Sequence, residues 1–344
     1  MRKKDRILFF SLTRDFLEIY LPQDTPSEKT IKTYRDALTV FRRYINDEKG
    51  YSIKNFTFAQ CTFDLVLDYR NWLVDIEKKQ RSIVNNRISV IKAYIRYAAA
   101  KDITLQQIYL NVSDVPFLRL PKKVQPIIED TEMLKALLDS PPNTKTGCRD
   151  TMILSLLYDT MIRAEELLRL DIGDLILNSV TPYLMIHGKG NKERIAPISR
   201  EVLPLINAYM QEYHEIDQTE VLTPFIYTFQ YGEMHRMSER NLERIVKKYA
   251  DIIRKTYPEL PKSISPHTFR RTRGTGLYRD GVAIEAIATI MGHASIQTTK
   301  DHYAFPSLEQ KRDAIEKGSG FVVLKEEKEW PDNEDELAKL CGIR

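Results

Sequence analysis

The first hundred residues carry apolar side chains at the spacing of α-helices. Between residues 31 and 45, isoleucine, leucine and aromatic residues fall every three or four positions, with Ser27 ahead of them as a candidate N-cap. Similar stripes run over residues 63–76 and from Ser82 to about residue 98. Because an amphipathic helix buries its apolar stripe, these helices should pack on one another. The pattern predicts an all-α N-terminal domain over residues 1–112.

The third of these predicted helices has a polar face as well as an apolar one. Its polar face can reach phosphates through four side chains: Arg81, Asn85, Lys92 and Arg96. A helix of this kind can pack on its own domain and bind the backbone of a nucleic acid with its other side. The residues alone are equally consistent with an ordinary solvated face, so both interpretations stay open.

Prolines end the helical pattern after the N-terminal domain. Pro116, Pro121 and Pro126 interrupt the stretch between residues 111 and 130. Proline cannot continue the interior of a helix, so we predict a linker over residues 113–128. The linker carries cations that could follow a nucleic-acid backbone, namely Arg119, Lys122 and Lys123.

Helical patterns return beyond the linker. Asp130-Thr131-Glu132 begins a predicted helix, and apolar helical runs follow at residues 149–158 and about 163–170. From residue 201 onward the pattern is again mostly helical, and one predicted helix has Ser238 as its cap. The exposed side of that helix adds two candidate DNA contacts, Arg244 and Lys247.

Two short strands interrupt these helices. Residues 183–187 and 194–198 have strand character, and the Gly-Lys-Gly-Asn-Lys-Glu segment between them has the composition of a hairpin turn. We therefore predict an α+β second domain over residues 129–317, mainly α with a small antiparallel β-sheet.

The remaining residues, 318–344, form a predicted tail. Gly318-Ser319-Gly320 has the composition of a hinge, and apolar residues on one face then predict a short helix at residues 334–340. A helix this short is marginal alone in water. We expect it to dock on its own domain or on a neighbouring subunit.

Composition and charge narrow the class of protein only a little. The 344 residues carry a net charge of +4, and residues 321–344 hold seven acidic and four basic side chains, a net of −3, so the rest carries +7. A basic body suits a polyanionic ligand, although a globular protein with a solvated tail fits the same numbers. No apolar run is long enough for a membrane span, and the N-terminus lacks the pattern of a signal peptide. The three cysteines form no metal-type pair, so we expect free thiols in a reducing cytoplasm and no metal site.

A phenol, two imidazoles and a guanidinium occur toward the end of the predicted second domain. They belong to His267, Arg270, His293 and Tyr303, and Tyr303 stands ten residues after His293. A phenol can attack phosphorus, a guanidinium can hold a phosphate, and imidazoles can move protons or donate hydrogen bonds. The set suggests that the chain cuts and rejoins a nucleic-acid backbone through a covalent phosphotyrosine.

Five elements, in order, resemble those of the tyrosine recombinase or phage integrase family. They are residues 160–167 around Arg163, residues 187–194 around Lys189, His267-x-x-Arg270, Met291-Gly292-His293, and Tyr303. Their order and spacing cover most of residues 126–317, and the helical N-terminal part resembles the core-binding domain of that family. One element alone would be weak, but five in order are specific.

The chain departs from the family pattern at two positions. Met161 stands where the family usually has glycine, which puts in doubt a turn with positive φ or a close helix packing before Arg163. Arg271 stands where the family often has histidine. Neither position supplies a catalytic side chain.

The chemistry of phosphodiester cleavage assigns roles to the matching residues. In-line attack builds negative charge on the non-bridging oxygens, to which Arg163 and Arg270 can donate paired N–H groups. The Tyr303 hydroxyl, whose ordinary pKa is about 10, must lose its proton as it attacks, and His267 is the candidate acceptor. Lys189, on the hairpin, is the candidate acid for the leaving 5′ oxygen.

Further residues complete the candidate site. His293 would hydrogen-bond the phosphate, and Glu166, one helical turn after Arg163, could orient Arg163 or His267. Because the arginines supply positive charge and the covalent bond retains the energy of the cleaved linkage, we expect no metal, no ATP and no other cofactor. Three more cations are candidates for DNA contact: Lys192, Arg194 and Arg271.

Several histidines and a second tyrosine are given no catalytic role. His187 and His302 flank the motifs without holding a motif position, so we predict that they are structural or lie near DNA. His214 and His235 are predicted to lie on the surface. Tyr278 falls within an apolar helical pattern, which predicts a core position.

The resemblance also implies an architecture and partners. Two domains would close on duplex DNA as a C-shaped clamp, and a homo-tetramer would assemble through the C-terminal tails on short, roughly palindromic sites. No extra arm-binding domain is expected, and accessory DNA-bending or directionality proteins are further candidate partners. We expect a cytoplasmic, nucleoid-associated enzyme that integrates or excises a mobile element or performs a related DNA rearrangement.

Other activities stay open from the residues alone. A type IB topoisomerase uses similar chemistry as a monomer and relaxes supercoiled DNA without site preference. A catalytically silent DNA-binding relative would keep the fold alone, although it would have no use for Tyr303. A hairpin-forming telomere resolvase would yield closed DNA ends.

Overall fold

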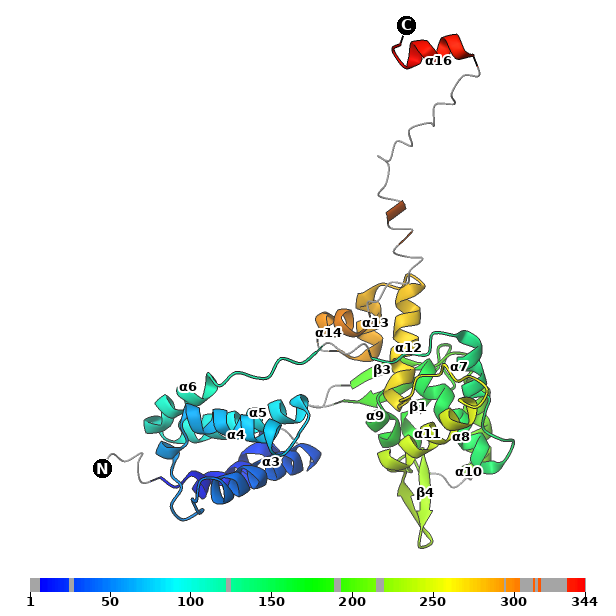
Figure 1. The fold of residues 1–344 in the computed structure, drawn as a ribbon. Helices are drawn as coiled ribbons and strands as arrows, with labels where there is room; N and C mark the ends of the chain where they lie inside the picture. Colours follow the sequence, from blue (N-terminus) through cyan, green and yellow to red (C-terminus); the bar gives the residue numbers. More distant parts are fainter. Residues whose placement is uncertain are drawn as a thin grey trace. The chain divides into compact units, whose positions relative to one another are not determined.

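The chain forms two compact units, residues 1–123 and 124–344 (Figure 1). Each unit has its own hydrophobic core. The computed structural model describes residues 7–24, 28–121, 125–188, 193–214, 220–293, 295–303, 312, 315–316 and 333–343, without the side chains of residues 24 and 301–303. The division falls within the segment that the sequence predicts as a linker. Most of the described chain is helical and the strands form small antiparallel sheets, which confirms the predicted fold class.

The first unit consists of helices packed around aromatic side chains. Phe9 is fully buried, and the rings of Phe58 and Tyr94 lie with their centroids 4.9 and 5.2 Å from its own. The three helices that the apolar spacing predicts are present, while the candidate cap Ser27 lies outside the described residues. The described helices are α1 (Thr13–Asp15), α2 (Leu21–Asp24), α3 (Glu28–Asp47), α4 (Phe63–Asp75), α5 (Arg81–Lys101) and α6 (Gln106–Ser113), with shorter turns at Phe9–Leu12, Phe16–Tyr20, Phe58–Gln60 and Ile103–Leu105.

The second unit is built around helix α8 (Lys145–Asp159), whose residues 152–154 and 156–157 are fully buried or nearly so. The predicted helix starts are confirmed at Asp130, which accepts the N–H of Glu132 at 2.7 Å, and at Ser238, which accepts the N–H of Asn241. Its described helices are α7 (Thr131–Leu138), α8 (Lys145–Asp159), α9 (Ala164–Arg169), α10 (Leu203–Tyr213), α11 (Glu239–Ile253), α12 (Pro266–Arg279), α13 (Ile284–Met291), α14 (Ile296–Tyr303) and α16 (Glu334–Leu340).

The predicted hairpin is part of a three-stranded antiparallel sheet, β1 (Leu175–Ile176), β2 (Tyr183–His187) and β3 (Glu193–Pro197). Strands β2 and β3 pair from Tyr183 opposite Pro197 to His187 opposite Glu193. This register places the connection that carries Lys189 directly after the last pair. Lys189 and Lys192 themselves lie outside the described residues.

The described chain after residue 201 is mostly helical, as predicted, but it also contains a hairpin that was not predicted from the sequence, β4 (Tyr227–Gln230) and β5 (Glu233–Arg236). Gln230 pairs with Glu233, so the loop consists of Tyr231 and Gly232 alone, with φ of 53° and 85°. Two residues with positive φ close a hairpin whose twist matches that of its strands. Tyrosine rarely adopts positive φ, so the loop carries little sequence signal.

The tail helix α16 spans the predicted residues, and the Asn333 side chain accepts the N–H of Asp335 at 3.0 Å. Leu337 is partly buried and Leu340 is exposed. Within the described ranges, no helix is both long enough and apolar enough to span a membrane.

Candidate active site

Arg163 stands directly before α9, in extended conformation, and its side chain is 45 % exposed. The turn that leads to it contains Met161 with φ of 53°. This is the positive-φ turn that the methionine had put in doubt, and the chain adopts it without glycine. The Met161 side chain is buried beside Ile287 and Met291 of α13, so its packing compensates for the backbone strain.

Glu166 joins two arginines at the start of α9. Its carboxylate accepts the backbone N–H of Arg163 and one guanidinium N–H of Arg163, both at 2.8 Å. It also accepts two N–H groups of Arg194, at 3.0 and 2.8 Å. Burial alone would raise the pKa of Glu166, but the hydrogen bonds from Arg194 and Arg163 outweigh it and lower the pKa to about 2. Glu166 is therefore a permanent anion at the pH of a cell.

Arg194, predicted to contact DNA, is directed into the unit and its side chain is only 16 % exposed. Besides the two bonds to Glu166, its Nε lies 3.4 Å from the carbonyl oxygen of Ile290. The side chain also passes over Gly292, where a Cβ would lie 2.6 Å from Cδ of Arg194. Gly292 has φ of 65° and ends α13, so both its conformation and its contact favour glycine.

Arg270 is the largest buried side chain of the unit, with 1 % exposure. It comes from α12 and donates to the carbonyl oxygen of Met161, two residues before Arg163. A second N–H donates to the carbonyl oxygen of Met291 at 2.8 Å and lies 2.9 Å from Nε2 of His293. One guanidinium thus connects the segment before Arg163 to the third motif.

These contacts determine the tautomer of His293. A guanidinium can only donate, so Nε2 of His293 accepts from Arg270 and the ring proton lies on Nδ1. Nδ1 then donates to Oγ1 of Thr299 at 2.8 Å, and Thr299 is fully buried. Sequence reasoning missed Thr299 because a single threonine six residues after a histidine carries no recognisable signal.

Two further catalytic candidates, His267 and Tyr303, belong to neighbouring helices of this unit, whereas Lys189 lies outside the described residues. His267 is exposed in the first turn of α12, one turn before Arg270. Tyr303 is the last residue of α14, and its side chain lies outside the described part of the chain. Hydrogen bonds thus link Arg163 to Glu166 and Arg270 to His293, and Arg270 also binds the backbone two residues before Arg163. His267 lies on the helix of Arg270.

Three of the four polar side chains predicted on α5 hold the segment that follows α6. The Asn85 amide donates to the Leu118 carbonyl at 2.9 Å and accepts the Leu118 N–H at 2.8 Å. Lys92 donates to the carbonyl oxygens of Ser113 and Val115, and Arg81 to that of Arg119. These bonds fasten residues 113–119 along the helix. Arg96 and Arg119 are exposed, whereas Lys122 and Lys123 are not among the described residues.

The other predicted DNA contacts have different surroundings. Arg244 and Lys247 are exposed on α11, and Arg244 lines a hollow of about 890 Å³ with Gln230 of β4. Arg271 is half-buried, and its guanidinium lies 3.4 Å from the carbonyl oxygen of Pro126. DNA contact by any of these residues stays a prediction.

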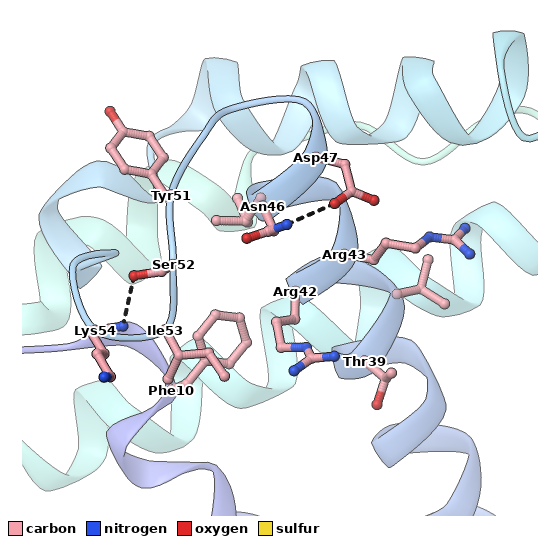
Figure 2. Close-up of a pocket in the computed structure, with 12 residues that line it drawn as sticks. Phe10, Thr39, Arg42, Arg43, Asn46, Asp47, Tyr51, Ser52, Ile53 and Lys54 are labelled. Atoms are coloured by element: carbon pink, nitrogen blue, oxygen red, sulfur yellow. Dashed lines mark hydrogen bonds between the residues drawn. The ribbon is translucent and has the colours of Figure 1, made fainter.

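The first unit contains a hollow of about 620 Å³ between the C-terminal half of α3 and the loop after it. Figure 2 shows Phe10 and Ile53 against its wall, with Arg42 and Lys54 beside them. None of the predicted catalytic or DNA-contact residues lines it.

The residues without a catalytic role are also placed. His187 lies 2.9 Å from Asp174 and 3.2 Å from Glu193, and the hydrogen bond with Asp174 is the main reason its pKa is raised. The prediction of a surface position is wrong for His214, which is 6 % exposed and hydrogen-bonded to a backbone carbonyl among aromatic rings. His235 is exposed and Tyr278 is partly buried against a core cluster. His302 has no described side chain.

Comparison with known proteins gives matches over both units. Residues 129–309 match the model of the phage integrase family, and residues 8–114 match the phage integrase SAM-like domain. The tyrosine recombinase XerD of Staphylococcus epidermidis is 27 % identical over 296 residues, covering 84 % of this chain and 92 % of the relative. A tyrosine recombinase of Agathobacter rectalis is 30 % identical over 311 residues, covering 87 % and 93 %.

Solved structures show the same fold. The XerH site-specific recombinase bound to its difH substrate matches with a TM-score of 0.60 and 18 % identity, over 83 % of this chain and 78 % of that one. The Tn1549 transposon integrase in complex with transposon right end DNA matches with a TM-score of 0.61 and 17 % identity, over 88 % and 98 %.

Proposed function

Because the chain belongs to the phage integrase family and is a site-specific DNA recombinase by class, we propose that it works through a 3′-phosphotyrosine on Tyr303 and releases a 5′-hydroxyl. The observation that carries this proposal is the linkage made by Arg270, which donates to the turn before Arg163 and to the region of His293. That linkage brings the Arg163 turn, Arg270 and His293 together in one unit. Integration or excision of a mobile element, or a related rearrangement, is the proposed biological role.

The proposed step balances without a cofactor. The phenolic oxygen of Tyr303 forms a bond to phosphorus, and the bond from phosphorus to the 5′ oxygen breaks. His267 accepts the phenolic proton and Lys189 supplies a proton to the leaving oxygen. Arg163 and Arg270 stabilise the charge on the non-bridging oxygens. Rejoining is the same step in reverse, with a 5′-hydroxyl as the nucleophile.

The proposed partner is double-stranded DNA with short, roughly palindromic sites. The Tn1549 integrase is described in complex with transposon right end DNA, and XerH with its difH substrate, which supports this choice. The two units would close on the duplex as a C-shaped clamp, and four protomers would assemble with α16 of each docked on the next. Deletion of the residues after Gly318 should then abolish synapsis while single-site binding persists, and unchanged recombination by the truncated chain would contradict the assembly.

The chemistry can be tested with a nicked suicide substrate, from which the cleaved strand end diffuses away. The wild-type chain should form a protein–DNA adduct stable to denaturant, and Tyr303→Phe should form none. Tyr278→Phe is the matched control, because it removes a phenol from α12 but keeps the ring that packs on Met161 and Met291, and it should form the adduct. An adduct with Tyr303→Phe would overturn the assignment. Relaxation of supercoiled plasmids without site preference would favour a type IB topoisomerase.

A further inference from the structure

Arg194 lies where three parts of the candidate site meet. It belongs to β3, it binds the carboxylate at the start of α9, and it covers the glycine that ends α13. We propose that Arg194 is a positioning residue that holds β3, and so the stem of the hairpin that precedes the Lys189 connection, against the Arg163 turn and the third motif. The inference rests on the proposed function, because it concerns delivery of the proton to the leaving oxygen.

The contact with Glu166 is bidentate and sheltered. Two parallel N–H groups of Arg194 meet the two carboxylate oxygens at 3.0 and 2.8 Å, and the side chains are 16 % and 10 % exposed. Such fork-to-fork pairs fix direction as well as distance. Lysine carries the same charge but can offer only a point contact, so Arg194 is suited to orientation and not merely to neutralisation.

Arg194 lies close to the end of the hairpin that precedes the Lys189 connection. Arg194 pairs with Ile186, and only the pair of His187 with Glu193 separates it from the connection that carries Lys189. A side chain that fixes β3 at this point therefore fixes the stem from which the general acid extends. The other pairs of the hairpin lie farther from the connection.

Gly292, at the end of α13, is the third contact of the Arg194 side chain. Any side chain there would meet Cδ and Nε of Arg194, since a Cβ would lie 2.6 Å from each. The α13 segment also approaches through the carbonyl oxygen of Ile290, 3.4 Å from Nε. The glycine before His293 thus leaves room for an arginine that comes from a different element.

A direct DNA contact is the competing role for Arg194. A cation that neutralises a phosphate releases a counterion. Removal of such a cation weakens DNA binding and reduces the slope of log K against the logarithm of the salt concentration by about 1. A residue already paired with a carboxylate inside the unit releases none. DNA affinity and its salt dependence therefore separate the two roles.

The experiment compares two suicide substrates for Arg194→Lys, one with the natural oxygen leaving group and one with sulfur at the bridging 5′ position. A thiolate leaves without a proton, so a defect in delivering the acid should disappear with sulfur. We expect adduct formation to slow on the order of a hundredfold with oxygen and less than about tenfold with sulfur, since a general acid contributes factors of this size. DNA affinity and its salt dependence should equal those of the wild type.

Matched variants separate the inference from a general structural effect. Arg236→Lys is the control, because Arg236 similarly fastens the β4–β5 hairpin to the Arg169 carbonyl at the end of α9 and to the Asp171 carboxylate. It should react at the wild-type rate with both substrates. Gly292→Ala should slow the wild type more than it slows Arg194→Ala, in which the obstructing side chain is absent. Equal effects in the two backgrounds would contradict the packing.

The outcomes also distinguish this inference from the proposed function. An unchanged rate for Arg194→Lys, a defect that sulfur does not relieve, or a reduced salt dependence of binding would each overturn the positioning role alone. Lys189→Ala provides the reference, because its defect should be relieved by sulfur to the same extent. An adduct formed without Tyr303 would overturn the proposed function itself.

Discussion

Replacement of Glu166 by glutamine tests how the candidate site is held together. The glutamine would keep the shape of the side chain, but its amide N–H₂ would face guanidinium donors, and the charge that attracts Arg163 and Arg194 would be lost. The difference between an ordinary pKa of 4.5 and one of about 2 corresponds to about 3 kcal/mol of favourable interaction. We expect Glu166→Gln to lower the free energy of unfolding of the second unit by about 2–3 kcal/mol at pH 7.

The sign of the pH dependence makes this prediction specific. The pKa of Glu166 is lowered on folding, so its contribution is fully present above about pH 4.5 and is lost as the pH falls toward 2. The difference between wild type and variant should therefore shrink by about 1 kcal/mol between pH 7 and pH 3.5. Protonation of the carboxylate in the wild type removes the same interaction that the substitution removes.

Hydrogen–deuterium exchange in urea is the appropriate assay, because peptides from α8 report on the second unit separately from the first. Glu165→Gln, at the exposed neighbouring position, removes the same charge and should change stability by less than about 0.5 kcal/mol. Two results would refute the reasoning. One is an equal loss for the two variants, and the other is a Glu166→Gln difference that stays constant between pH 7 and pH 3.5.

Three further predictions concern the turn before Arg163, the hairpin and the α5 surface. Met161→Gly should retain about 1 kcal/mol more stability than Met161→Ala in thermal or urea unfolding. Both variants lose the buried side chain, but only glycine adopts the positive φ without strain. The opposite order of stability would show that the turn is not strained. His187 should titrate above 6.5 in NMR spectra, and Asp174→Asn should lower that pKa. The contact between His187 and Asp174 stabilises the fold below pH 6.5, and this contribution is lost as the pH rises through the raised pKa. An unshifted titration of His187 would exclude the contact. Asn85→Ala should cost about 1–2 kcal/mol and speed amide exchange at Leu118, and unchanged exchange there would mean that the segment is held by other bonds.

Predictions from the sequence succeed for elements that are specified by interactions between residues close in the chain. The helices α3, α4 and α5, the caps of α7 and α11, and the β2–β3 hairpin follow from apolar spacing, capping residues and turn composition. These signals lie within a few residues of the element that they specify. They can therefore be recognised without knowledge of the rest of the fold.

Contacts with a partner distant in the chain leave no local signal in the sequence. Asn85 and Lys92 have the composition of a DNA-binding face, but their partners are backbone groups more than twenty residues later, in the segment after α6. The role of Arg194 depends on a carboxylate 28 positions away and on a glycine of another helix. Residue type identifies a cation, whereas only tertiary contacts decide whether it meets a phosphate or a carbonyl.

The charges at the candidate site explain why one carboxylate serves two arginines. Glu166 contributes one negative charge against the two positive charges of Arg163 and Arg194, so this trio keeps a net charge of +1. Arg270 adds a further positive charge, held by the carbonyl dipoles of Met161 and Met291. A phosphodiester carries one negative charge, and attack by a phenolate adds a second to the transition state. A second carboxylate would cancel the field that favours this state, and removing Glu166 would leave the arginines without a fixed direction. Glu166 therefore orients both arginines and still leaves the site with a net positive charge.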